Sequence, residues 1–389
     1  MKPWKIEARD PLVVRDGRPK QGTGDAGTLP FPLPGTVAGV VRTRAGSNEN
    51  GAFVAHNRLD DLRKIAIRGP LLCSEDGSLY VPRPRDALFV ATDNGRVVRA
   101  LRPLPNEAGR FDSALTTPPV GLDAQRAIDG KPPRDLPVWW TWTSLLRWLT
   151  APADGDESQV AKLLDGGIAG LPREHRTHVK IGEGFTAEDG MLFETVGLRM
   201  IAPSEVPGTR GKLRAKPLAL SFGVEIPADV TGLALRRGVG PFAGERRLVR
   251  WSEGGPTWPD TLPDKLVESL SNPGPSARVR LLLLTPAIFK AGSQPGTAIG
   301  QMCESRDAVK VSLVASIVPR PETISGWDFA QDKPKGTTRV VPAGSVYWLE
   351  VAGTVEARLA WARTVWMKNV SDEAKHRNDG YGLAVLGVA

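Results

Sequence analysis

The sequence predicts an α+β fold whose first part runs as a strand, a helix and two further strands. Residues 6–14 are rich in apolar and β-branched side chains, which is typical of a strand. A helix is expected from Pro34, because proline suits the first helical turn and the apolar residues after it recur on one face. Two apolar runs, 66–73 and 79–90, flank a turn at 74–78 and indicate paired strands. This order begins a ferredoxin-like β-α-β-β-α-β unit.

The length of 389 residues allows two domains of ordinary size, and 41% hydrophobic residues are enough for substantial cores. Glycine (42) and proline (34) are spread along the chain, which indicates many tight loops and not a disordered tail. Lysine and arginine number 51 against 43 acidic residues, so the formal net charge is +8. A charge of this size indicates nucleic-acid binding only if the cations cluster.

The two cysteines, Cys73 and Cys303, lie far apart and have no metal-ligand spacing. This usage is typical of a reducing, cytoplasmic protein with buried thiols. Residues 1–5 are followed by no apolar run, so we expect no signal peptide. The longest apolar runs, such as 281–284, are far too short to span a bilayer, so no membrane partner is expected.

The middle of the chain alternates irregular and regular segments. Residues 102–137 are rich in proline, glycine and charge and are expected to be irregular. The run W-W-T-W-T-S-L-L-R-W-L at 139–149 predicts an aromatic helix whose tryptophans lie in the core or in an interface. A short helix is expected at 158–165. Residues 174–199 predict a long hairpin with its tip at 186–190, which we expect to project from the body.

The second half predicts a further set of strands and helices. A strand begins near Leu218, and a glycine-hinged loop with a basic end covers 238–251. The remaining elements expected are strands at 278–289, 309–317 and 344–351 and helices at 264–270 and 357–368. The chain closes with a glycine turn and a final strand, so we expect the C-terminus to lie inside a sheet.

Basic residues cluster beside glycines and at the ends of the expected strands. The clusters are Arg15/Arg18/Lys20, Arg42/Arg44, Arg173/Arg176/Lys180, Arg210 to Lys216, Arg246/Arg247/Arg250 and Lys333/Lys335/Arg339. The small residues Gly35 and Thr36 at the first helix start, beside the loop cations, would suit a phosphate. The alternating cations at 210–216 share one face of an extended segment. They either form a basic stripe that binds a polyanion or belong to a solvent-exposed edge strand, where lysine is common. Several modest clusters fit an extended polyanion such as single-stranded RNA better than a point ligand.

The sequence contains no nucleophile elbow, phosphate-binding loop or dinucleotide motif. Glu174, His175 and His178 have a spacing that a metal on a helix would need, but their surroundings are strand-like, so no metal and no cofactor are expected. His376, near Tyr381, would offer an acid/base pair for metal-free RNA cleavage, or else a hydrogen-bonding residue in a glycine loop.

Two blocks, D-P-L-V-V-R-D-G-R-P at 10–19 and P-F-P-L-P-G-T-V-A-G-V-V-R-T-R at 30–44, resemble the opening of a known family. This family is the third RAMP subunit of the Cmr complex, the type III-B CRISPR effector. Similar blocks continue to the end of the chain: R-T-H-V-K-I through D-G-M-L-F at 176–193, F-A-G-E-R-R at 242–247, I-S-G-W-D at 324–328, V-P-A-G-S-V-Y at 341–347 and G-Y-G-L-A-V-L-G at 380–387.

The resemblance implies two ferredoxin-like (RRM-like) RAMP domains with long inserted loops and a projecting hairpin. Residues 1–205 would form the first, with a helical insertion and the hairpin, and residues 206–389 the second, ending in the glycine-rich loop and final strand. It implies a non-catalytic subunit that holds the repeat-derived 5′ tag of the crRNA. Its partners would be the large polymerase/cyclase-like subunit and the adjacent backbone RAMP subunit, with target RNA met indirectly.

Carried onto this chain, the resemblance implies an RNA-binding set. Its members are Arg15, Arg18, Lys20, Gly35, Thr36, Arg42, His178, Lys180, Arg246, Arg247, Lys335, Arg339, Arg377 and Tyr381. The closing loop departs from the family pattern at Asn378-Asp379, because an aspartate repels phosphate. Two alternatives stay open: a metal-independent crRNA-processing endoribonuclease with His178, His376 and Tyr381 as acid/base residues, and a subunit whose basic loops meet acidic protein surfaces.

Overall fold

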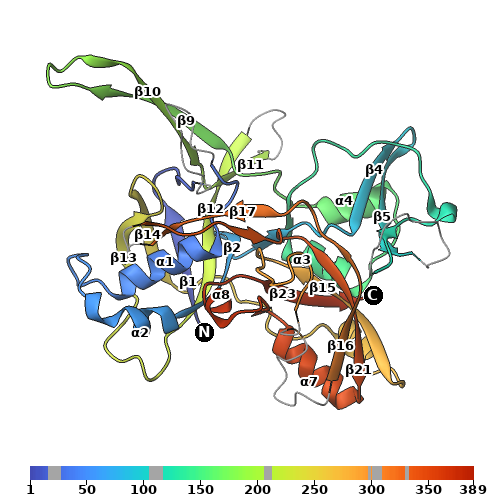
Figure 1. The fold of residues 1–389 in the computed structure, drawn as a ribbon. Coiled ribbons are helices and arrows are strands. Elements are labelled where there is room, and N and C mark those ends of the chain that lie inside the picture. The colour runs from blue at the N-terminus through green and yellow to red at the C-terminus, as the bar shows by residue number, and fades with distance from the viewer. Residues whose placement is uncertain (16–27, 105–116, 206–212, 297–298, 300–308, 329–332) are drawn as a thin grey trace. The chain divides into compact units, whose positions relative to one another are not determined.

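The computed structural model describes residues 1–15, 28–104, 117–205, 213–296, 299, 309–328 and 333–389, and Figure 1 shows the fold. The chain forms two compact units, each assembled from three separate segments. Unit 1 comprises 1–77, 170–256 and 322–339, and unit 2 comprises 78–169, 257–321 and 340–389. The sequence predicted two domains that are each continuous in the chain, with the boundary between 205 and 206. The two units of the structure are instead each made of several separate segments.

Unit 1 is built on an antiparallel sheet. Its strand order is β13 (Gly238–Phe242), β14 (Arg247–Glu253), β1 (Lys2–Ala8), β12 (Leu213–Glu225) and β2 (Ala66–Ser74), and β11 (Ile201–Glu205) also pairs with β12. In the register, Trp4 lies opposite Phe222, and Ile6 opposite Leu220 and Trp251. All five side chains are buried, so alternation in three strands supplies one apolar face.

Helices of unit 1 follow the first strand. They are α1 (Pro34–Ala45), the 3₁₀ turn η1 (His56–Arg58) and α2 (Leu59–Lys64). The helix predicted from Pro34 is therefore confirmed, and it buries Val37 and Val41 as its apolar face. The strand predicted at 6–14 begins earlier and ends at Ala8, because Pro11 has no N–H for a ladder.

The predicted hairpin forms from β9 (Arg173–Ile181) and β10 (Ala187–Leu198), and Figure 1 shows it extending from the sheet that holds β1 and β12. Its tip was predicted wrongly at 186–190. The turn lies at 182–186, where the N–H of Gly182 donates to the carbonyl of Thr186 (2.9 Å) and Phe185 has a φ of 57°. The glycine-rich G-E-G run closes the hairpin, and the later residues form an irregularity between Ala187 and Leu192.

Unit 2 contains a five-stranded antiparallel sheet. The order is β16 (Val309–Ile317), β21 (Val346–Gly353), β15 (Ser276–Leu283), β23 (Leu383–Val388) and β22 (Lys368–Asn369). Its helices are α3 (Trp142–Thr150), α4 (Glu157–Leu164), α5 (Asp264–Leu270), α7 (Val355–Val365) and α8 (Ala374–Asn378). The final strand β23 lies between two others, which confirms that the C-terminus lies inside the sheet.

Short elements complete both units. Unit 2 has the pairs β3 (Leu79–Pro82)/β8 (Trp139–Thr141), β4 (Ala87–Thr92)/β5 (Gly95–Ala100) and β6 (Arg102–Pro103)/β7 (Val120–Gly121), and the 3₁₀ turn η2 (Ala124–Arg126). The remaining pairs are β17 (Glu322–Ile324)/β20 (Thr338–Val340) and β18 (Trp327–Asp328)/β19 (Lys333–Pro334). Within the described residues, no helix has the length and apolarity needed to cross a membrane.

Two predicted elements are divided in the structure. The strand expected at 79–90 is interrupted between β3 and β4, where Arg85 N–H donates to the carbonyl of Gly344 (3.0 Å). The helix expected at 139–149 begins only at Trp142, because the hydroxyl of Thr141 accepts from Ser144 N–H and caps it there. Trp140 and Trp148 are buried, as the sequence predicted for this aromatic run.

A buried ion pair organises unit 2. Arg280 of β15 forms an ion pair with Asp86, and both side chains are almost completely buried. The indole N–H of Trp148 donates to the same carboxylate (2.9 Å), while Arg280 donates to the carbonyls of Trp148 (2.7 Å) and Val388 (2.7 Å). One side chain thus ties α3, β15 and the C-terminal strand together.

Candidate nucleic-acid interface

Four backbone segments of unit 1 meet around Arg15, and we call their meeting point the loop junction. Arg15 forms a bridge with Thr28, and Val13 forms one with Gly244 of the β13–β14 turn. The hydroxyl of Thr28 donates to the carbonyl of Val196 in β10 (3.0 Å). Both flanks of the basic loop are therefore fixed beside the hairpin base and the β13–β14 turn. Arg18 and Lys20 lie outside the described residues.

The β13–β14 turn has an unusual backbone. Ala243, Glu245 and Arg246 all have positive φ values (54°, 57° and 49°), a region that non-glycine residues rarely adopt. Such conformations persist where surrounding structure enforces them, and they cluster at functional sites. The carboxylate of Glu245 forms an ion pair with Arg15, which holds the turn against the loop junction. The side chain of Arg246 is exposed.

The two faces of the hairpin differ in chemistry. On one face, the His178 ring stacks on Phe193 with centroids 5.1 Å apart and planes 16° apart, and its Nε2 lies 2.8 Å from the Thr195 hydroxyl. Alternation places Arg176 and Lys180 on this same face. Phe193 is 43% exposed, so the stack is open to solvent. Lys180 and Arg176 flank it, and Arg176 forms an ion pair with Glu174 on the same face. We call this the aromatic face.

The opposite hairpin face is aliphatic toward the tip. Val179 pairs with Leu192, and Ile181 follows on the same side; their exposed fractions are 40%, 61% and 54%. Phe185 in the turn is 91% exposed. Gathered exposed apolar side chains are typical of surfaces that bind partners.

The hairpin excludes the metal site that the histidine spacing allowed. His175 lies on the aliphatic side, where its Nδ1 is 2.8 Å from Glu194, whereas His178 lies on the aromatic face. An odd separation in a strand puts two side chains on opposite faces. Within the described part of the chain, no group of three or more His, Cys, Asp or Glu residues is placed to hold a metal ion.

Some of the predicted cations hold the fold together. Arg42 donates to the carbonyl of Ile65 from Nε (3.3 Å) and Nη2 (2.9 Å). Arg44 donates to the carbonyls of Arg236 (2.6 Å) and Arg237 (2.9 Å) and lies 5.2 Å from the Trp251 ring. Burial and the neighbouring Arg236 lower the pKa of Arg44. These arginines fasten α1 to the loops beside it.

Other predicted contacts lie at the surface of unit 1. Gly35 and Thr36 form the first turn of α1, and Lys335 and Arg339 are exposed. Of the alternating stripe, 210 and 212 lie outside the described residues, Arg214 is exposed, and Lys216 forms an ion pair with Asp76 (2.9 Å). Cys73 is buried, as predicted, and burial raises the pKa of its thiol to about 11; Cys303 lies outside the described residues.

The closing loop of unit 2 is packed internally. Tyr381 is only 5% exposed, and Arg377 Nη1 donates to the carbonyls of Ser371 (2.7 Å) and Asp372 (2.6 Å). Gly382 has a φ of 86°, and a Cβ there would lie 2.7 Å from the Ser371 nitrogen. This loop is therefore built around a close backbone approach that only glycine allows.

Two residues of the interface escaped the sequence analysis. Phe193 was missed because a tip centred on Glu188 places His178 opposite Leu198 and not opposite Phe193. Glu245 was missed because its ion pair with Arg15 joins residues 230 positions apart. The exposed phenylalanine within a charged strand was the signal available for the first, and no local pattern signals the second.

Comparison with known proteins decides the family. A family model described as "CRISPR-associated protein (Cas_Cmr3)" matches residues 4–389. The chain belongs to the Cas_Cmr3 family. No curated protein matches the chain. The family match covers both units and all the described elements of the interface.

Solved structures similar to this Cas_Cmr3 chain are distant. Two are chains of type III-B Cmr-beta bound to cognate target RNA, one of them also with AMPPnP; identities are 15% and 14% and TM-scores 0.45 and 0.46. Each alignment covers 89% of this chain and 86% of the other. A third belongs to a Csm3–Csm4 subcomplex of the type III-A interference complex, with 10% identity, a TM-score of 0.31 and coverages of 91% and 94%.

Proposed function

We propose that this Cas_Cmr3 chain is a non-catalytic, RNA-binding subunit of a type III-B CRISPR effector complex that holds the repeat-derived 5′ tag of the crRNA. One observation carries the proposal: the aromatic face of the hairpin exposes the His178–Phe193 stack between cations. Unstacked RNA bases bind on aromatic rings of this kind, while neighbouring cations meet the phosphates.

The loop junction extends this surface. Arg15 and the exposed Arg246 lie where the basic loop, the β13–β14 turn and the hairpin base meet. A single strand that stacks on Phe193 then has cations along its backbone path toward the body of unit 1. Contacts on the hairpin and at the loop junction, in separate segments of the chain, suit a polyanion better than a mononucleotide.

The aliphatic hairpin face supports a protein partner on the opposite side. We assign Val179, Ile181 and Leu192 to contacts with neighbouring subunits, the large polymerase/cyclase-like subunit and the adjacent backbone RAMP subunit. Both partners follow from the proposed complex, and target RNA would be met through them.

The RAMP relationship includes a ferredoxin-like organisation, and unit 2 supports it. Strands β15, β16, β21 and β23 occur in the chain order strand, crossover, two strands, helix α7 and strand. In the sheet they stand in the order β16-β21-β15-β23, as a split β-α-β unit requires. In unit 1, the strands β2, β12, β1 and β14 stand in the corresponding order, but the described residues between β12 and β14 form no helix. The same organisation for the first domain therefore stays a prediction.

The endoribonuclease alternative is less well supported. Tyr381 is buried, and its ring meets His376 only edge-on, with centroids 6.4 Å apart. His178 belongs to unit 1 and His376 to unit 2. A general acid and a general base must both reach the scissile phosphate, and a buried tyrosine does not.

The proposal is tested by titrating the full chain with single-stranded RNA that carries the cognate repeat-derived tag. Phe193→Ala should weaken binding by roughly 5- to 160-fold, the range for losing one stacked base. The matched control is Leu192→Ala, which truncates the neighbouring side chain on the opposite face; Leu192 is more exposed (61%) than Phe193 (43%). Equal affinities for the two variants would contradict the proposal.

A second readout uses salt. Each lost phosphate contact lowers the slope of log affinity against log salt by about 0.7 for a single strand. Arg246→Ala should therefore flatten the slope by roughly this amount. An unchanged slope would remove the β13–β14 turn from the RNA path and leave the hairpin result standing.

A further inference from the structure

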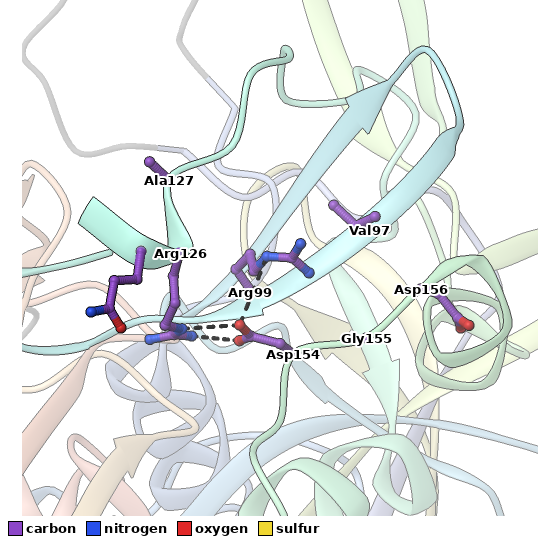
Figure 2. A pocket seen from close by; sticks show the side chains of 8 residues that line it. Val97, Arg99, Arg126, Ala127, Asp154, Gly155 and Asp156 are labelled. Atoms are coloured by element: carbon purple, nitrogen blue, oxygen red, sulfur yellow. Dashed lines mark hydrogen bonds and ion pairs between the residues drawn. The ribbon is translucent and has the colours of Figure 1, made fainter. Parts of the chain in front are cut away.

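A pocket in unit 2 has no role in the function proposed so far. Its volume is about 370 Å³, and Figure 2 shows the side chains that line it. They come from β5, from η2 and from the segment before α4, and the chemically active ones are Arg99, Gln125, Arg126, Asp154 and Asp156.

Asp154 lies at the centre of the pocket wall; the Arg126 guanidinium turns toward it, whereas Arg99 approaches it through Nε alone (Figure 2). Arg126 binds its carboxylate through two nitrogens, with Nε 3.0 Å from Oδ2, and Arg99 Nε lies 3.8 Å from the same oxygen. Burial by itself would raise the pKa of Asp154, but hydrogen bonds from Arg126 and from Ala100 N–H keep this pKa below its ordinary value. The carboxylate is therefore a fixed negative charge.

The backbone holds these side chains in place. Arg126 Nη2 donates to the carbonyl of Ala100 (2.7 Å), and Arg99 Nη1 donates to that of Val98 (3.2 Å). Val98 and Gly155 exchange two backbone hydrogen bonds of 3.0 and 2.9 Å. The strand and the segment before α4 are thus joined next to the pocket, so Arg99, Arg126 and Asp154 are oriented before any ligand arrives.

The charges of the pocket decide between ligand classes. Two guanidinium groups and the carboxylates of Asp154 and Asp156 cancel, so a phosphate has no net attraction to this site. The pocket offers donors from Arg99 and Gln125, acceptors from Asp156 and the Gln125 carbonyl, and an aliphatic wall at Val97. A flat, neutral molecule with donors and acceptors on one edge matches this set.

We propose that the pocket binds one unstacked base of the RNA, with the Arg99 guanidinium against the base and Gln125 and Asp156 reading its edge. This inference rests on the proposed RNA-binding function and adds a second contact on unit 2. Nucleobases have the required mixture of donors and acceptors, and splayed single-stranded bases are bound by arginine planes and by contacts to their edges. Volumes of this size lie within the range of small-molecule sites.

The test is an abasic scan on the full chain. The RNA carries the repeat-derived tag, and each version lacks the base at one position while keeping every phosphate. The variants are Arg99→Ala and Gln125→Ala, which leave the Arg126–Asp154 pair intact, and the control is Lys162→Ala, an exposed residue on α4. Thermal unfolding of each variant checks that the unit is folded.

We expect one abasic position to cost about tenfold in affinity for the wild-type chain and for Lys162→Ala. Removing the same base should change the affinity of Gln125→Ala and of Arg99→Ala little, because in these variants the pocket no longer binds that base. If both pocket variants instead keep the wild-type abasic profile, or weaken every RNA equally as loss of a phosphate contact would, the pocket proposal is overturned. A wild-type chain that binds no RNA overturns the proposed function as well, which separates the two failures.

Discussion

The buried pair of Asp86 and Arg280 gives the sharpest stability prediction. Replacing Asp86 by alanine leaves the Arg280 guanidinium uncompensated at a site where the two side chains are 1% and 4% exposed. Removing one partner of a buried pair typically costs about 3–5 kcal/mol. The indole N–H of Trp148 loses its acceptor in the same change, so we expect the upper part of that range.

Thermal unfolding followed by circular dichroism measures this effect. For a unit of this size, each kcal/mol lowers the midpoint by roughly 2–4 °C, so Asp86→Ala should unfold about 10–20 °C below the wild type. Hydrogen exchange should locate the loss in unit 2, with faster exchange in β15 and β23, because Arg280 also binds the carbonyl of Val388. The matched control is Asp93→Ala, which truncates an exposed aspartate in the β4–β5 turn.

The double variant Asp86→Leu/Arg280→Met separates charge from packing. It removes both charges and should recover most of the lost stability, because apolar replacements of a buried pair are often neutral. A loss in Asp86→Ala that is within 1 kcal/mol of the Asp93→Ala value would refute the reasoning. Such a result would mean that water or a rearranged backbone satisfies Arg280 without Asp86.

Two further predictions concern the arginine contacts and pH. In Gly240→Ala, the new Cβ would lie 2.6 Å from Arg44 Nη1. Arg44 should therefore lose its hydrogen bonds to the backbone carbonyls, which should lower the free energy of unfolding by about 1–2 kcal/mol. The control Gly39→Ala has open space around its Cβ and should be neutral or slightly stabilising in thermal unfolding. Burial and the neighbouring Lys375 lower the pKa of His376; the unfolded chain therefore takes up the proton first, and stability should fall as pH drops through about 6.5 toward the folded pKa. The unfolding midpoint of His376→Gln should fall less at low pH than that of the wild type. An identical pH dependence of the midpoint in the two proteins would contradict this role of His376.

Local sequence determined many of the elements. Helix α5 spans Asp264–Leu270 and strand β16 spans Val309–Ile317, as predicted, and α1 begins at Pro34. Each of these depends on a period, a cap or a proline within one segment, and such interactions are formed by neighbours in the chain. The family could also be predicted, because the resembling blocks are read from the sequence alone, and the family model matches residues 4–389.

Tertiary structure alone decided the pairings between distant residues. The turn at 182–186 and the register shift between Ala187 and Leu192 together set the hairpin register, and this register brings Phe193 against His178. A shift of the turn by a few residues changes every partner across the hairpin, and a residue pattern with glycines at both candidate tips does not choose between them.

The pocket around Asp154 shows the same limit more strongly. Its arginines come from β5, a strand that the sequence analysis did not predict, and from η2, within the stretch expected to be irregular, and nothing local in either marks a binding site. Sequence determined which chemical groups this protein carries and most of the segments that carry them. Folding decided which of those groups meet, because contacts between distant segments depend on how sheets and loops close in three dimensions and not on the period of any one segment.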